Sequence, residues 1–162
     1  ALSPEQVHQQ IIDFVASGIA ASGEAKIGLP ALLDTINSQQ LKMAVATNSP
    51  KQLLDTTLQR LAIRHYFSAH CHLELVKQGK PAPDIFLYAA ERLCADPAQC
   101  LVIEDSENGV RAGRAAGMQV WGFLGGGHCY NGHGARLTRA GAHRVVENFA
   151  ALAQRLETEN RD

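Results

Sequence analysis

Three short polar segments contain the residue types that bind phosphate and a hard metal ion. They are Thr47-Asn48-Ser49, Lys80 with its flanking Gly79 and Pro81, and Glu104-Asp105-Ser106. A hydroxyl group and backbone N–H groups at the start of a helix bind anions readily, and a lysine supplies a point charge. Magnesium prefers oxygen ligands, typically one or two carboxylates together with phosphate oxygens and water. The three segments together predict a phosphate site with a hard metal ion.

Each segment alone also has a structural explanation. Thr-Asn-Ser before a helix is commonly a cap, and Lys80 with the prolines that follow it is typical of an exposed turn. The Glu104-Asp105 pair is harder to explain in this way because it directly follows an apolar run. Neighbours on a strand point to opposite faces, so one carboxylate faces the site. We expect Asp105 to be the direct metal ligand.

Alternating helix and strand patterns position these segments. Helices are predicted over 3–20, 30–39, Ser49 to about 61, 84–93, 106–116, 135–140 and 149–156. In the third of these helices we expect Leu53, Leu54, Leu58 and Leu61 to point inward. Strands are predicted over 41–46, 67–72, 100–103, 119–123 and 144–146. Such alternation predicts an α/β fold with a mainly parallel sheet. Ligands of open parallel sheets bind at the carboxyl ends of the strands, which is where the three polar segments lie.

Charge and composition exclude several classes of protein. The 162 residues include 15 Lys and Arg against 16 Asp and Glu, so the near-neutral chain has no excess of positive charge for nucleic acid. The longest stretch without a charged residue, 115–135, is diluted with Gly, His and Asn and does not predict a membrane span. The first residues lack the features of a signal peptide, which predicts a cytoplasmic protein.

The three segments resemble motifs of the haloacid dehalogenase-like superfamily, in particular its phosphatase and β-phosphoglucomutase branch. Residues 45–49 resemble the second motif, 79–86 the third and 102–110 the fourth, within a resemblance that covers roughly residues 27–150. The resemblance implies a Rossmann-like parallel sheet with helices on both faces, and catalysis through an aspartyl-phosphate. It implies that Thr47, Asn48 and Lys80 bind the substrate phosphate, that Thr47, Lys80 and Asp105 are catalytic, and that Asp105 and Glu104 bind Mg²⁺.

One family motif is missing. The nucleophile of the family lies in Asp-x-Asp-Gly-Thr at the end of the first strand, and no Asp in this chain is followed by x-Asp-Gly. We therefore expect residues 1–26 to be the remnant of a helical cap and residues 27–162 to be the α/β core without its first strand. That loss would leave two central strands with unpaired edges. The resulting hypothesis is that the chain is the C-terminal portion of a longer protein, whose N-terminal segment is then its partner.

The leading functional hypothesis is a Mg²⁺-dependent phosphatase of a small phosphorylated metabolite, with no nucleic-acid or membrane partner. A hexose-phosphate mutase resembling β-phosphoglucomutase shares all the motifs and is an alternative. A non-catalytic phosphate-binding or interaction module is an alternative of another class, because the nucleophile motif is missing. A carbon–halogen hydrolase is disfavoured, since that chemistry needs no metal and Glu104-Asp105 resembles a metal site.

Overall fold

Within the residues that the structure describes, a six-stranded parallel sheet forms the centre. The computed structural model describes residues 10–12, 28–126 and 130–159. Their strands are β1 (Gln10–Ile12), β2 (Lys42–Ala46), β3 (Ala69–Cys71), β4 (Cys100–Glu104), β5 (Gln119–Phe123) and β6 (Arg144–Val146). They are ordered β3-β2-β1-β4-β5-β6, and each neighbouring pair is parallel. The predicted α/β fold with a parallel sheet is confirmed.

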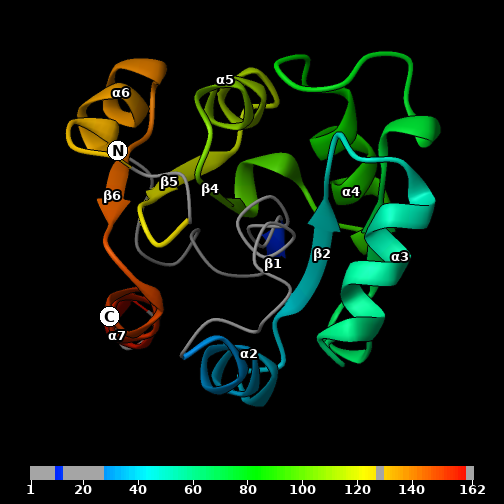
Figure 1. The fold of residues 1–162 in the computed structure, drawn as a ribbon, viewed down its shortest axis with the longest axis horizontal. Coiled ribbons are helices and arrows are strands. Elements are labelled where there is room, and N and C mark those ends of the chain that lie inside the picture. The colour runs from blue at the N-terminus through cyan, green and yellow to red at the C-terminus, as the bar shows by residue number, and fades with distance from the viewer. Residues whose placement is uncertain (1–9, 13–27, 127–129, 160–162) are drawn as a thin grey trace.

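Among the described residues, helices cover the two faces of the sheet (Figure 1). They are α2 (Leu29–Ser38), α3 (Lys51–Arg60), α4 (Asp84–Leu93), α5 (Glu107–Ala115), α6 (His133–Ala140) and α7 (Phe149–Glu159), with short 3₁₀ turns at Arg64–Tyr66, Leu73–Leu75 and Pro97–Gln99. Side chains from α2, α3 and α7 form one core cluster, and side chains from α4, α5 and α6 form the other. Along β2, Met43 and Val45 enter the first cluster, whereas Ala44 and Ala46 enter the second, as alternation along a strand requires.

The centre of the sheet differs from the sequence prediction. Residues 10–12 form β1, whose Ile11 is in register with Met43 of β2 and Leu101 of β4. The predicted helix over 3–20 is therefore wrong at residues 10–12, and its other residues lie outside the described ones. The expected unpaired edges are also wrong, because β1 pairs with both central strands. Ile11 and Ile12 are β-branched residues that favour a strand. The pairing of β1 gives hydrogen-bond partners to backbone groups of the two central strands, which would otherwise lack them inside the sheet.

The start of α3 is a second departure. Pro50, rather than Ser49, is in the cap position, and the Ser49 N–H donates to Thr47 Oγ1 at 3.0 Å. Leu53 was expected to point inward but is 47% exposed, whereas Leu54 and Leu58 are buried. At the start of α5 a side chain does cap the helix, because Ser106 Oγ accepts a hydrogen bond from the Gly109 N–H at 3.0 Å. The strands predicted over 119–123 and 144–146 are confirmed at both ends.

In the part of the chain that the structure describes, no helix combines the length and the apolar character needed to cross a bilayer. The assignment of residues 1–26 to a cap remnant and 27–162 to the core stays a prediction.

Candidate functional site

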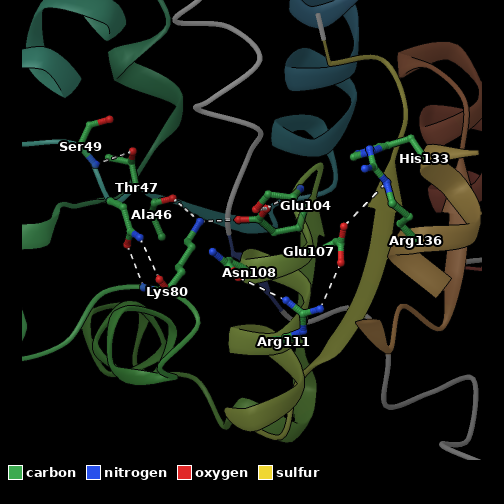
Figure 2. A pocket seen from close by; sticks show the side chains of 12 residues that line it. Ala46, Thr47, Ser49, Lys80, Glu104, Glu107, Asn108, Arg111, His133 and Arg136 are labelled. Carbon is green, nitrogen blue, oxygen red and sulfur yellow. Dashed lines mark hydrogen bonds and ion pairs between the residues drawn. The ribbon is translucent and has the colours of Figure 1, made fainter. Parts of the chain in front are cut away.

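The three polar segments meet at one cavity. It has a volume of about 530 Å³ and lies where β2 and β4 end and α5 and α6 begin (Figure 2). Its lining comprises Ala46, Thr47, Asn48, Ser49, Lys80, Glu104, Ser106, Glu107, Asn108, Arg111, His133 and Arg136. The structure thus brings together four of the five predicted site residues, Thr47, Asn48, Lys80 and Glu104, at the expected end of the sheet.

Lys80 places a cation in the wall of the cavity. Its side chain is only 10% exposed and forms an ion pair with Glu104 Oε1. The ammonium also donates to the carbonyl oxygen of Ala46 at 3.0 Å and lies 4.8 Å from the centroid of the Phe86 ring. These contacts hold the charge at the carboxyl ends of β2 and β4. A buried cation so held can bind an anionic ligand that enters from the cavity.

Glu104 is the carboxylate that faces the cavity. Its Oε2 accepts hydrogen bonds from Ser106 N at 3.2 Å and Ser106 Oγ at 2.9 Å, while Oε1 contacts Lys80. A Cβ atom built on Gly109 would overlap this carboxylate, so the glycine in the first turn of α5 makes room for it. Gly109 therefore packs closely against a residue of the site.

The turn after β2 presents the Thr47 hydroxyl to the cavity. Thr47 Oγ1 accepts a hydrogen bond from the Ser49 N–H, which leaves the Thr47 O–H available as a donor toward the cavity. The Ser49 N–H is therefore directed at Thr47. Asn48 also lines the cavity, but its side-chain amide is hydrogen-bonded to the main chain of Lys80. The roles of Thr47 and Asn48 as phosphate ligands stay predictions.

Asp105 is buried and is not among the residues that line the cavity. Its carbonyl oxygen accepts a hydrogen bond from His133 Nε2 at 2.6 Å, and His133 Nδ1 accepts one from Arg136 Nη2 at 2.9 Å. Because an arginine only donates, this arrangement places the ring proton of His133 on Nε2. The expected metal-binding role of Asp105 stays a prediction.

A metal ion at this site would rely on few protein ligands. Glu104 lines the cavity, whereas its neighbour Asp105 does not, and the described residues contain no group of three His, Cys, Asp or Glu side chains that could hold a metal. A hard cation with one or two carboxylate ligands takes its other ligands from phosphate oxygens and water. A cation bound to Glu104 would share that carboxylate with the Lys80 ammonium.

Sequence reasoning missed the part of the lining that comes from α5 and α6. Glu107 and Arg111 lie one turn apart on α5 and form an ion pair at 3.1 Å. Their i, i+4 spacing, which begins within the fourth motif, could have predicted this pair from the sequence. His133 and Arg136 carried no comparable signal, because the predicted helix began at residue 135. Only the folded chain brings α6 next to α5.

Comparisons with known proteins agree with this geometry. A family model described as haloacid dehalogenase-like hydrolase matches residues 4–117. Fructose-1-phosphate phosphatase YqaB of Escherichia coli is 40% identical over 121 residues, which cover 74% of this chain and 62% of that protein. Beta-phosphoglucomutase of Bacillus subtilis is 40% identical over 94 residues, which cover 56% of this chain and 39% of the enzyme.

A solved structure shares the fold. The HAD family hydrolase from Deinococcus radiodurans, crystallised with bound phosphate and sodium, has a TM-score of 0.78 and 32% identity, over 85% of this chain and 61% of that one. The chain thus spans less than two thirds of the length of each of these proteins. Since three motifs converge on one cavity and the family model matches most of the residues, the chain belongs to the haloacid dehalogenase-like hydrolase family.

Proposed function

We propose that this protein is a Mg²⁺-dependent phosphatase of small phosphorylated metabolites, phosphorylated sugars in particular. The observation that carries the proposal is the buried Lys80 ammonium, which lies beside Thr47 and Glu104 in the wall of one cavity. The similarity to a fructose-1-phosphate phosphatase supports the substrate class. We further propose a cytoplasmic location, which the free thiols of Cys94 and Cys100 support.

Lys80 and Thr47 act on the phosphoryl group in this proposal. The Lys80 ammonium binds the phosphate oxygens, and the Thr47 hydroxyl donates a hydrogen bond to them. Glu104 and Asp105 hold Mg²⁺, in a family whose phosphatases and phosphomutases generally use a divalent metal. When bound, the metal neutralises charge on the phosphoryl oxygens. This division suits phosphoryl transfer, where catalysis consists mainly of positioning and charge stabilisation.

The nucleophilic step is assigned to none of the 162 residues, because no Asp of the chain is followed by x-Asp-Gly. We propose that an N-terminal segment of the same protein supplies Asp-x-Asp-Gly-Thr. The coding sequence upstream of Ala1 tests this directly, since an authentic start codon at that point would contradict it.

Binding of inorganic phosphate tests the site itself. We expect the 162-residue chain to bind phosphate in the presence of Mg²⁺ by isothermal titration calorimetry, and Lys80→Ala to weaken that binding at least tenfold. Lys51→Ala is the matched control, because it removes an exposed lysine whose partner is Asp55, outside the cavity. Equal phosphate affinity of the wild type and Lys80→Ala would refute the proposed site.

Two other functions each have an observation in their favour. The similarity to a beta-phosphoglucomutase favours a sugar-phosphate mutase, and assays of the product of the complete coding sequence would distinguish free phosphate from an isomerised sugar phosphate. The missing nucleophile motif, with β1 in the central position of the sheet, favours a non-catalytic phosphate-binding module. That protein would bind phosphate and Mg²⁺ without releasing phosphate from an activated aryl phosphate.

A further inference from the structure

The cavity has two ends with different charge. At one end Lys80 and Glu104 form an ion pair of zero net charge. At the other end, Glu107 and Arg111 from α5 and Arg136 from α6 form a second group, which we call the arginine pair site (Figure 2). This group has two guanidinium groups and one carboxylate, so its formal charge is positive. The positive charge at this end therefore comes from two arginines that lie outside the three motif segments.

Glu107 holds the two guanidinium groups beside each other. Its Oε2 accepts a hydrogen bond from Arg111 Nη2 at 3.1 Å, and its Oε1 lies 3.7 Å from Arg136 Nε. Arg111 Nη1 also contacts Asn108 Oδ1 at 3.3 Å, and Arg136 Nη2 contacts His133 Nδ1 at 2.9 Å. A guanidinium group has five N–H donors, and the contacts above engage two donors on each arginine. Donors therefore remain for a ligand.

Exposure and chemistry favour a ligand over a purely structural role. The side chains of Arg111 and Arg136 are 51% and 45% exposed, and exposed ion pairs contribute little to stability. Both side chains line the same cavity as Lys80. The planar guanidinium fork matches the oxygens of a carboxylate or a phosphate. A cavity of about 530 Å³ has space for a metabolite that reaches from Lys80 to the arginines.

We propose that Arg111 and Arg136 bind a second anionic group of the substrate, so that the preferred class is a phosphorylated metabolite with a further carboxylate or phosphate. This inference rests on the proposed function, because it assumes that the first phosphate binds at Lys80. Glu107 keeps the two arginines aligned before the ligand arrives. The second anion adds charge-assisted hydrogen bonds that a singly phosphorylated sugar lacks.

Three ligands built on one sugar skeleton test the inference. Glucose 6-phosphate has one anionic group, 6-phosphogluconate adds a carboxylate, and glucose 1,6-bisphosphate adds a phosphate. By calorimetry on the full chain with Mg²⁺, we expect at least one of the two doubly anionic ligands to bind ten or more times more tightly than glucose 6-phosphate. Which of the two shows the gain identifies the second group as carboxylate or phosphate.

Substitutions then assign that gain to the arginines. In the double variant Arg111→Gln/Arg136→Gln, we expect the doubly anionic ligand to bind less than twofold more tightly than glucose 6-phosphate. The affinity for glucose 6-phosphate itself is expected to be unchanged. Arg92→Gln, on α4 and outside the cavity lining, removes one positive charge as the control and should preserve the gain. Equal binding of all three ligands by the wild type, or equal loss for all three in the double variant, overturns the inference.

The failure of this inference differs from the failure of the proposed function. If glucose 6-phosphate binds in a Lys80-dependent way but a second anion adds nothing, the phosphate site stands and only the arginine pair site is refuted. If no ligand binds, or if Lys80→Ala changes nothing, both proposals are refuted.

Discussion

Asn48 and Lys80 are joined by two hydrogen bonds of opposite direction. Asn48 Oδ1 accepts from the Lys80 N–H at 2.9 Å, and Asn48 Nδ2 donates to the Lys80 carbonyl oxygen at 3.1 Å. The amide side chain thus links the turn after β2 to the loop before α4. A Cβ atom on Gly79 would lie 2.7 Å from Asn48 Oδ1, so that glycine leaves the space in which the contact forms. Asn48 is therefore placed to position Lys80.

A double-mutant cycle distinguishes this positioning role from direct phosphate binding. We expect Asn48→Ala and Lys80→Ala each to weaken phosphate binding, and the double variant to bind no more weakly than Lys80→Ala alone. Residues that act through one another give non-additive effects, whereas independent contacts add. Additive losses in calorimetry would show that Asn48 contacts the phosphate by itself.

The ion pair between Lys80 and Glu104 predicts a stability effect that depends on burial. Both side chains are at most 10% exposed. Removing one partner of a buried pair costs about 3–5 kcal/mol, so Lys80→Met is expected to lower the free energy of unfolding by that amount in urea titrations. Lys51→Met breaks the exposed pair with Asp55 and should leave the free energy of unfolding nearly unchanged. Similar losses in the two variants would contradict the effect of burial.

Most of the site was predictable because it lies in continuous segments that follow apolar strands. Lys80, Thr47 and Glu104 were placed from their own neighbours in sequence, and the fold required only that the strands be parallel. The strand at residues 10–12 was not predictable, because Val7 and Ile11 are also at helical spacing and their strand partners are distant in sequence. The hydrogen bonds of Asn48 and the packing of α6 on α5 depend on three-dimensional contacts that no local pattern records.

Two histidines predict how stability depends on pH. The pKa values of His70 and His143 lie below the ordinary 6.5, mainly because partial burial disfavours the imidazolium. The positive charges of Arg64 beside His70 and of Arg114 beside His143 also lower the pKa. Backbone hydrogen bonds at both histidines, and Asp55 at His70, oppose this shift in pKa. The unfolded chain then binds more protons than the folded one below about pH 6.5, so stability falls as the pH drops through this range.

Urea midpoints at pH 7.5 and 5.5 measure the effect. The wild type is expected to lose stability between these values, and His70→Gln/His143→Gln is expected to lose less, because glutamine has no proton to gain. An equal loss in the two proteins would assign the pH dependence to other groups.

Gly109 connects the packing of α5 with the chemistry of the site. A side chain at this position would overlap the Glu104 carboxylate, so Gly109→Ala is expected to displace Glu104 and with it the contact to Lys80. Gly113→Ala is the matched control, because the same substitution on the same helix brings a Cβ atom to 2.7 Å from Val120 Cγ2, within the apolar core. Both variants should unfold at lower urea concentration than the wild type. Only Gly109→Ala should also weaken phosphate and Mg²⁺ binding in calorimetry, and equal affinities in the two variants would show that Glu104 tolerates the displacement.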